Sequence, residues 1–295
     1  TVAGLTAVGY AALYANTSGI ENVAVGFEAL KTLSTGNYNT AVGYGAADAM
    51  STGSANTIVG DVAATALTTG GDNTVFGRNA LAAITTAGSN TAIGGNAAAA
   101  LTSGQYNIAI GKNCMYAIVT GDSNIGVGND TFTVLTSGAA NIAMGRYTLD
   151  ALTTGSSNIG IGAPSLSGVT TGSNNVGIGV SAGTAITTGD YNTAVGKSAM
   201  EVLTTGTNNT AIGYTAGSDL TGSYNTCVGN GAGSQGTGSH NVAIGRIAFD
   251  GTGSGGSNVA IGYDAMGVTG DGANNTCVGA QAGAAITTGD YNVCL

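Results

Sequence analysis

One spacing runs through almost the whole chain and limits what the chain can fold into. Asparagine returns at every seventeenth position, with two steps that are one position shorter near the C-terminal end, and glycine follows four positions after each asparagine wherever the chain extends that far. The asparagines are Asn22, Asn39, Asn56, Asn73, Asn90, Asn107, Asn124, Asn141, Asn158, Asn175, Asn192, Asn209, Asn225, Asn241, Asn258, Asn275 and Asn292. This repeat predicts an all-β fold, a parallel β-solenoid or β-roll of about seventeen 17-residue coils in a single array over residues 1–295.

Each coil carries the pattern of a short strand between turns. The residue after each asparagine is β-branched and a large apolar residue usually follows two positions later, as in Thr40 and Val42. Alternation puts these two side chains on one face and the small residue between them, Ala41, on the other. Small residues seven positions after the asparagine, such as Ala29, and leucine or isoleucine eleven positions after it, such as Leu33, are the expected partners of this inner face. We expect two closely packed sheets in each coil, joined by Thr-Thr-Gly and Asn-containing turns.

Stacked coils place each asparagine above the next one, at the strand spacing of about 4.8 Å. The side-chain amides are then expected to form a hydrogen-bonded ladder, as in other stacks of identical strands. A stack of this size would be a rod on the order of 80 Å long by the same spacing. A ligand or metal site along the asparagine column is the alternative to this structural ladder.

The large side chains of the strand pose a separate question. If alanine and glycine fill a narrow interior, the Val/Ile rows face outward and form a continuous apolar stripe, which favours association. We therefore expect a homotrimer in which three chains bury this stripe around a common axis. The alternative is a monomer with a wider coil, in which the same rows lie inside.

Composition and charge exclude several classes of function. The net charge is −9 and only six residues are basic, so the chain lacks the cations that nucleic-acid binding requires. No run of 18 or more apolar residues occurs, which argues against insertion into a membrane. With 53 glycines, no tryptophan and 7% charged residues, any core must be thin.

Residues with catalytic or metal-binding chemistry are sparse, and we expect no catalytic, cofactor or metal site and no enzyme activity. His240 occupies a turn position where other coils have tyrosine, and Cys227, Cys277 and Cys294 replace the small inward residue of the strand. A contact between Cys277 and Cys294 across adjacent coils is left open. Acidic residues lie near the turns, and they lack the pattern of calcium-binding β-rolls. These residues are Asp72, Asp122, Asp190 and Asp290.

One surface row mixes basic and aromatic residues five positions after the asparagine. Its possible contact residues are Tyr44, Arg78, Lys112, Arg146, Lys197, Tyr214, Arg246 and Tyr263. Such a row could contact a cell-surface glycan or receptor, and the alternative is a solvated column without a ligand. The coils around residues 218–256 are irregular, because two of the asparagine spacings there are shortened and the turns are rich in glycine.

The segments Asn39 to Tyr44 and Asn209 to Tyr214, spaced by Thr-Thr-Gly turns, resemble repeats of phage tail fibres and bacterial surface fibres. Such arrays often precede an endosialidase-type intramolecular chaperone domain. The repeats are also similar to the head repeats of trimeric autotransporter adhesins, which have a shorter period. The resemblance implies a trimer located outside the cell or on the virion surface, and we expect the chain to be part of a longer fibre protein.

Three classes of function compete at this stage. The first is a structural or adhesive fibre segment, favoured by uniform repetition. The second is a solenoid that binds a flat surface such as ice, or a glycan, because paired threonines such as Thr68 and Thr69 form ladders. Alternation would send one threonine of each pair inward, which weakens this alternative. The third is a depolymerising tailspike enzyme, which would need paired acidic residues in a cleft.

Overall fold

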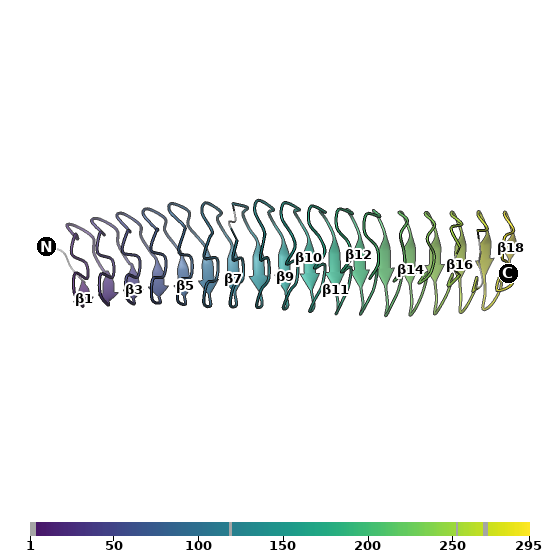
Figure 1. Cartoon of the computed structure of the whole chain (residues 1–295), viewed down its shortest axis with the longest axis horizontal. Helices are drawn as coiled ribbons and strands as arrows, with labels where there is room; N and C mark the ends of the chain where they lie inside the picture. The colour runs from purple at the N-terminus through teal and green to yellow at the C-terminus, as the bar shows by residue number, and fades with distance from the viewer. Residues whose placement is uncertain (1–3, 118–119, 252, 268–270) are drawn as a thin grey trace. The chain divides into compact units, whose positions relative to one another are not determined.

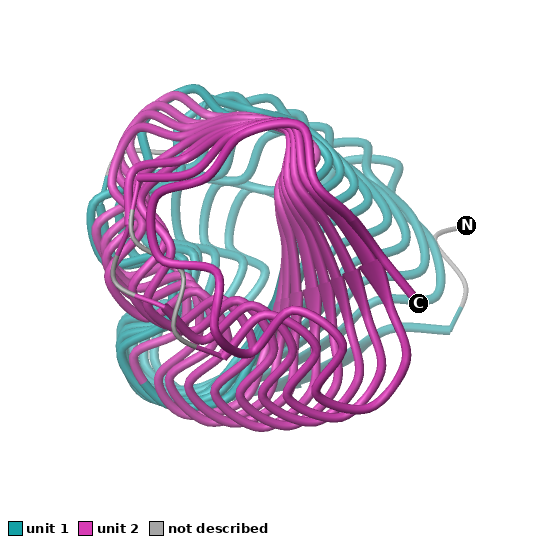
Figure 2. Ribbon diagram, turned by 90° about the vertical axis from the view of Figure 1, so that its right-hand side faces the viewer, with its two compact units in different colours: residues 1–146 teal, residues 147–295 magenta. Residues whose placement is uncertain are grey.

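The chain folds into a β-solenoid whose coils each contribute one short strand (Figure 1). The computed structural model describes residues 4–117, 120–251, 253–267 and 271–295. By its internal contacts the chain divides into two compact units, residues 1–146 (unit 1) and 147–295 (unit 2), shown in two colours in Figure 2. Both units are built from the same coil, and no helix occurs in the ranges described.

The described residues of unit 1 form nine strands. These are β1 (Thr6–Val8), β2 (Val23–Val25), β3 (Thr40–Val42), β4 (Thr57–Val59), β5 (Thr74–Phe76), β6 (Thr91–Ile93), β7 (Ile108–Ile110), β8 (Ile125–Val127) and β9 (Ile142–Met144). Each strand pairs in parallel with the strand of the next coil, in a register of one repeat that sets Thr40 opposite Thr57. The predicted parallel solenoid is confirmed.

Unit 2 repeats this arrangement. Its strands are β10 (Ile159–Ile161), β11 (Val176–Ile178), β12 (Thr193–Val195), β13 (Thr210–Ile212), β14 (Thr226–Val228), β15 (Val242–Ile244), β16 (Val259–Ile261), β17 (Thr276–Val278) and β18 (Val293–Cys294). The two shortened coils keep the strand pairing, with Thr210 opposite Thr226 and Thr226 opposite Val242. In a shortened coil, the Nδ2 of Asn209 donates to the carbonyl of Gly222, which is 13 residues later in the sequence. In a regular coil, the Nδ2 of Asn192 donates to the carbonyl of Gly206, which is 14 residues later. The shorter coils therefore lose their residue at the Thr-Thr-Gly corner, outside the strands.

The interior of each unit is thin, as the composition predicts. Ala24 and Ala41 in the strands, Ala29 in the opposite wall and Leu33 beside the corner are all fully buried. A larger side chain at one buried position is accompanied by a smaller one at a neighbouring buried position. Where the large Phe132 is buried, the inward strand residue is Gly126, and a Cβ atom there would lie 2.6 Å from the Cys114 Sγ. The packing partners inferred from the sequence are confirmed.

The expectation of two sheets in each coil is wrong. Opposite the strand lies a wall of turns, in which the residues six and eight positions after the asparagine have positive φ in most coils, +58° at Glu28 and +49° at Leu30. The wall still bonds both neighbouring coils, because the Glu28 N–H donates to the Tyr10 carbonyl (2.8 Å) and the Leu30 N–H to the Ala46 carbonyl (3.1 Å). Left-handed residues at every second position let the chain curl closely around the small inward Ala29, where a flat second strand would have needed a wider interior.

The glycine four positions after each asparagine is required by this geometry. Gly43 has a φ of +142°, and a Cβ atom on it would lie 2.2 Å from the carbonyl oxygen of Gly60 in the next coil. Both its backbone conformation and the approach of the next coil exclude a side chain. The glycine column therefore marks a corner at which successive coils approach each other closely.

Candidate functional site

The asparagine column lies inside each unit as a hydrogen-bonded ladder. From Asn22 to Asn275 the asparagines are at most 3% exposed. In unit 1, the Asn22 Oδ1 accepts hydrogen bonds from the backbone N–H (2.9 Å) and Nδ2 (3.1 Å) of Asn39, and the Asn22 Nδ2 donates to the Gly36 carbonyl (2.8 Å). The amide therefore closes its own coil and also ties that coil to the next. Because its oxygen and nitrogen are both bonded within the chain, this column has a structural role.

The outer strand face is the surface formed by the residues one and three positions after each ladder asparagine. The first of these residues is half-buried along most of the array, while the second is half-buried or exposed. Apart from the terminal Val293, large apolar side chains of this face are 36–44% exposed at the most open positions, which are Phe76, Ile93, Met144, Ile161, Ile178, Ile212, Ile244, Ile261 and Val278. The prediction that the Val/Ile rows point outward is confirmed, and the alternative of a wider coil that encloses them is wrong.

The paired threonines line a corner instead of alternating between inside and outside. Thr68 is half-buried and its Oγ1 donates to the Thr85 carbonyl in the next coil (2.9 Å), while Thr69 is exposed. Thr187 makes the same bond to Thr204 (3.2 Å) in unit 2. The expectation that one threonine of each pair points inward is therefore wrong. One hydroxyl column is committed to bonds between coils.

The predicted contact row is exposed in both units, but its rings and charges pair with one another. In unit 1, Phe27 stacks between Tyr10 and Tyr44 with ring centroids 5.1 Å apart, so the faces of the middle ring are covered. The Nε atom of Arg78 lies 3.6 Å from the Oδ2 atom of Asp61. Lys112 and Arg146 are also exposed. The unit 2 members are Lys197, Tyr214, Arg246 and Tyr263, all exposed. The Arg246 guanidinium carbon lies 5.7 Å from the centre of the Tyr263 ring. An exposed ion pair such as Arg78 with Asp61 adds little stability.

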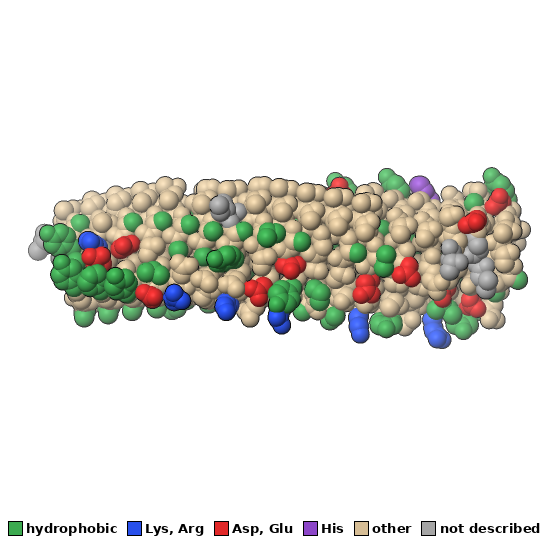
Figure 3. Space-filling view, in the orientation of Figure 1, with side chains coloured by type: hydrophobic (Ala, Val, Ile, Leu, Met, Phe, Trp, Pro, Cys, Tyr) green, Lys and Arg blue, Asp and Glu red, His purple; other side chains and the backbone are tan. Residues whose placement is uncertain are grey.

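Charged groups are sparse on the surface as a whole. On the face drawn in Figure 3, basic and acidic side chains occupy narrow bands, and wide areas of both units carry no charge. This leaves uncharged surface available for contacts that depend on shape, apolar area and hydrogen bonds.

The residues considered for catalysis or metal binding have structural partners. His240 stacks on Tyr224 (5.0 Å between ring centroids) at a turn with positive φ. The carboxylates of Asp122, Asp190 and Asp290 each accept a backbone N–H from the preceding coil, at 2.6–2.8 Å. Asp72 occupies the exposed turn position directly before Asn73. In the ranges that the structure describes, no cluster of three His, Cys, Asp or Glu residues could hold a metal ion.

The four cysteines are free thiols. Cys114, which the sequence left unassigned, lies in the turn wall, and Cys227 and Cys277 face inward from their strands. Desolvation raises the pKa of Cys114, Cys227 and Cys277 to about 12. Cys277 lies opposite Cys294 in the register of the two adjacent strands, and the neighbouring thiol adds to the desolvation that raises the pKa of Cys277. The contact left open by the sequence is thus present, between two thiols.

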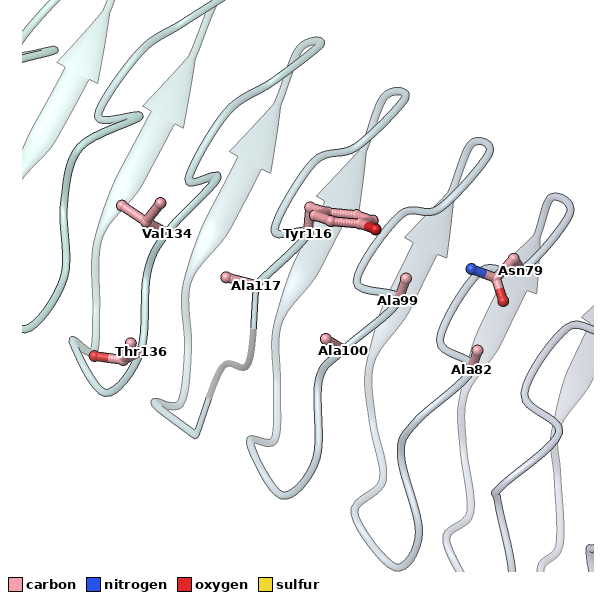
Figure 4. Close-up of a pocket in the computed structure, with 8 residues that line it drawn as sticks. All are labelled: Asn79, Ala82, Ala99, Ala100, Tyr116, Ala117, Val134 and Thr136. Carbon is pink, nitrogen blue, oxygen red and sulfur yellow. The ribbon is translucent and has the colours of Figure 1, made fainter.

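Unit 1 also contains a surface groove that the sequence analysis missed (Figure 4). It has a volume of about 630 Å³ and is open to solvent. Its lining residues are Asn79, Ala82, Ala99, Ala100, Tyr116, Ala117, Val134 and Thr136. The signal in the sequence is local: alanine stands at the ninth position of two successive coils, at Ala82 and Ala99, and a tyrosine follows in the next, Tyr116.

Comparison with protein-family models, with curated proteins and with solved structures found no match for this chain. Among the residues described, no helix has the length and apolar character needed to cross a membrane. The functional argument therefore depends on the ladder, the outer strand face and the groove.

Proposed function

We propose that this chain is a structural and adhesive segment of an extracellular or virion-surface fibre, and that it associates with two further copies of itself along the outer strand face. The observation that carries this proposal is the uninterrupted row of apolar side chains three positions after the ladder asparagine, on the outer strand face of each unit. The resemblance of the repeats to tail-fibre and adhesin repeats supports the same location and assembly.

The energetics of the outer strand face favour burial. In unit 1, Phe76 is 44% exposed, Ile93 38% and Met144 43%, and they stand on paired strands at the same position of their coils. In unit 2, Ile161 and Ile178 pair in adjacent strands and are 37% and 38% exposed. Each square ångström of apolar surface removed from water contributes roughly 25 cal/mol. Contiguous apolar surface of this kind marks an interaction site in soluble proteins.

A second copy of the same chain is the partner that matches this surface best. Paired strands present their apolar side chains at one spacing, which the two shortened coils keep, and another copy presents them at the same spacing. The strand of each coil is only three residues long and is bordered by the asparagine and glycine corners. Each chain therefore offers a narrow apolar edge, and three such edges can meet around a common axis with each edge contacting the other two.

Charge placed on the outer strand face tests this proposal. We expect the double variant Ile93→Glu/Ile212→Glu to lower the sedimentation coefficient to that of a single chain, because a carboxylate cannot be buried there without a partner. The matched control is Tyr106→Glu/Tyr191→Glu, which adds the same charge at residues that are each 60% exposed and lie in the turns. Circular dichroism checks that both variants keep the coil. Unchanged association of the isoleucine variant, or equal dissociation of the control, contradicts the proposal.

A further inference from the structure

The groove of unit 1 departs from the repeat at one place. Nine positions after the ladder asparagine, the first coils carry Lys31, Asp48 and Thr65, so this position accepts large and polar side chains. Two alanines then follow, Ala82 and Ala99, before the large ring of Tyr116. The hollow is therefore not a requirement of the coil.

The lining of the groove is apolar at its floor and polar at its ends. The methyl groups of Ala82, Ala99, Ala100 and Ala117 form much of the lining. The Tyr116 ring is 51% exposed and leans along the groove toward Ala99 (Figure 4). No charged residue is among the described residues that line the groove. The ligand that suits it is neutral, with an apolar face and polar edges.

Asn79 begins a short amide ladder at one end of the groove. Its Nδ2 donates to the Oδ1 of Asn96 (3.0 Å), Asn96 donates to Asn113 (3.2 Å), and Asn113 donates to the carboxylate of Asp130 (3.0 Å). Asp130 can only accept when ionised, so all the amides of this short ladder point the same way. The Asn79 Oδ1 is left at the open end of the ladder and accepts no hydrogen bond from the protein in the ranges described.

We propose that this groove binds a neutral saccharide. A pyranose ring has an apolar face of C–H groups that packs on the Tyr116 ring and the alanine floor, since aromatic side chains combine a large apolar body with a polar tip. One of its hydroxyl groups bonds the Tyr116 hydroxyl. Few polar groups that fix orientation in a mostly apolar pocket are typical of small-molecule sites. An anionic or cationic ligand would find no opposite charge in the lining.

The groove stays accessible when the chains associate. Its residues belong to the turn wall and the corner that follows it, whereas association uses the outer strand face. The saccharide site supplies a contact for the adhesive part of the proposed function and rests on it to that extent. Binding of a saccharide at this site does not require self-association of the chain.

Saturation-transfer NMR on the full chain tests this inference. The probes are methyl glycosides of glucose, galactose, mannose and N-acetylglucosamine, together with linear glucose oligomers and a sialylated and a sulfated sugar for comparison. We expect at least one neutral sugar to bind, and Tyr116→Ala to weaken its binding about tenfold because the aromatic contact is lost. Ala82→Lys should abolish the signal by filling the hollow, with a side chain that the coil accepts at Lys31. The matched control Tyr106→Ala removes another exposed tyrosine of unit 1, outside the groove, and should bind as the unchanged chain does.

Two results would overturn the inference: no neutral sugar of the panel binds, or binding persists at full strength in both Tyr116→Ala and Ala82→Lys. Stronger binding of the sialylated or sulfated sugar would also overturn it, because the lining offers these groups no cation. Sedimentation of the same samples separates this outcome from the proposed assembly. Tyr116→Ala should leave association intact, whereas Ile93→Glu/Ile212→Glu should leave the saccharide signal intact.

Discussion

The Oδ1 atom of Asn175 accepts two hydrogen bonds from Asn192, one from the backbone N–H at 3.0 Å and one from Nδ2 at 3.2 Å. The Nδ2 of Asn175 in turn donates to the Gly189 carbonyl at 2.8 Å. One buried side chain therefore satisfies backbone groups in two places, at the closure of its own coil and at the start of the next. This relationship repeats along the column and explains why asparagine, with its donor and acceptor, occupies it.

Removing one member of the ladder should be costly. We expect Asn175→Ala to lower the free energy of unfolding by about 3 kcal/mol or more, because buried backbone groups lose their partners at about 1–3 kcal/mol each. Chemical denaturation monitored by circular dichroism measures this change. The control Asn230→Ala removes an exposed asparagine of unit 2 and should change the stability by no more than about 0.5 kcal/mol. A loss at Asn175 as small as the loss at Asn230 would show that the ladder does not stabilise the coil.

Two neighbouring glycines should respond differently to alanine. Gly43→Ala places a Cβ atom 2.2 Å from the Gly60 carbonyl oxygen at a φ of +142°, whereas a Cβ on Gly45 has its nearest neighbour at 4.0 Å. Other coils already carry non-glycine residues at the position of Gly45, such as Glu28 and Asn79. We expect Gly43→Ala to lower the free energy of unfolding by about 2 kcal/mol or more. Gly45→Ala should change it by less than about 1 kcal/mol. Equal effects in thermal unfolding would argue against the close approach of the coils.

Inner volume should be exchangeable between Gly126 and Cys114. We expect Gly126→Ala to destabilise unit 1 by about 1–3 kcal/mol, since its Cβ would lie 2.6 Å from the Cys114 Sγ. Cys114→Ala removes that sulfur, so the double variant should recover part of the loss. A double-mutant cycle by urea denaturation measures this coupling energy. Strict additivity of the two single effects would mean that the two side chains do not share the space.

The buried thiols predict a loss of stability at high pH. Desolvation raises the pKa of Cys227 from 9.0 to about 12 in the folded chain. Above pH 9 the unfolded thiol ionises while the folded one keeps its proton, so the unfolded state is favoured progressively up to about pH 12. The slope for one thiol is about 1.4 kcal/mol per pH unit. Because other groups also titrate in this range, the measured quantity is the difference in slope between the unchanged chain and Cys227→Ala, which should lack this contribution. Identical slopes would contradict the burial of this thiol.

Much of the coil could be predicted because its strongest constraints recur at one spacing. The asparagine column, the outward position of Val42 and the inward position of Ala41 follow from strand alternation and the period alone. The turn wall could not be predicted in this way. Glu28 and Leu30 adopt left-handed conformations that non-glycine residues rarely use, so nothing in their identities signals a turn. The hydrogen bonds to neighbouring coils hold them there, and these exist only once the coils have stacked.

The groove escaped prediction for a different reason. A repeat is recognised from residues that recur, whereas the groove arises where the ninth position of the coil becomes small at Ala82 and Ala99 and then large at Tyr116. A hollow depends on side chains that are missing relative to neighbouring coils, so it becomes visible only when the coils are placed in register. The contact row, in contrast, could be predicted from the sequence, because its residues recur and are exposed. The sequence did not show that the rings of Phe27 and Tyr44 stack and cover each other's faces.

The solution mass of the purified chain, measured by light scattering after size exclusion, tests the central claim most directly. The account predicts a particle of three chains that persists on dilution, with the outer strand face buried between them. A particle with the mass of one chain, 28.2 kDa, would contradict it and would leave the outer strand face exposed to solvent.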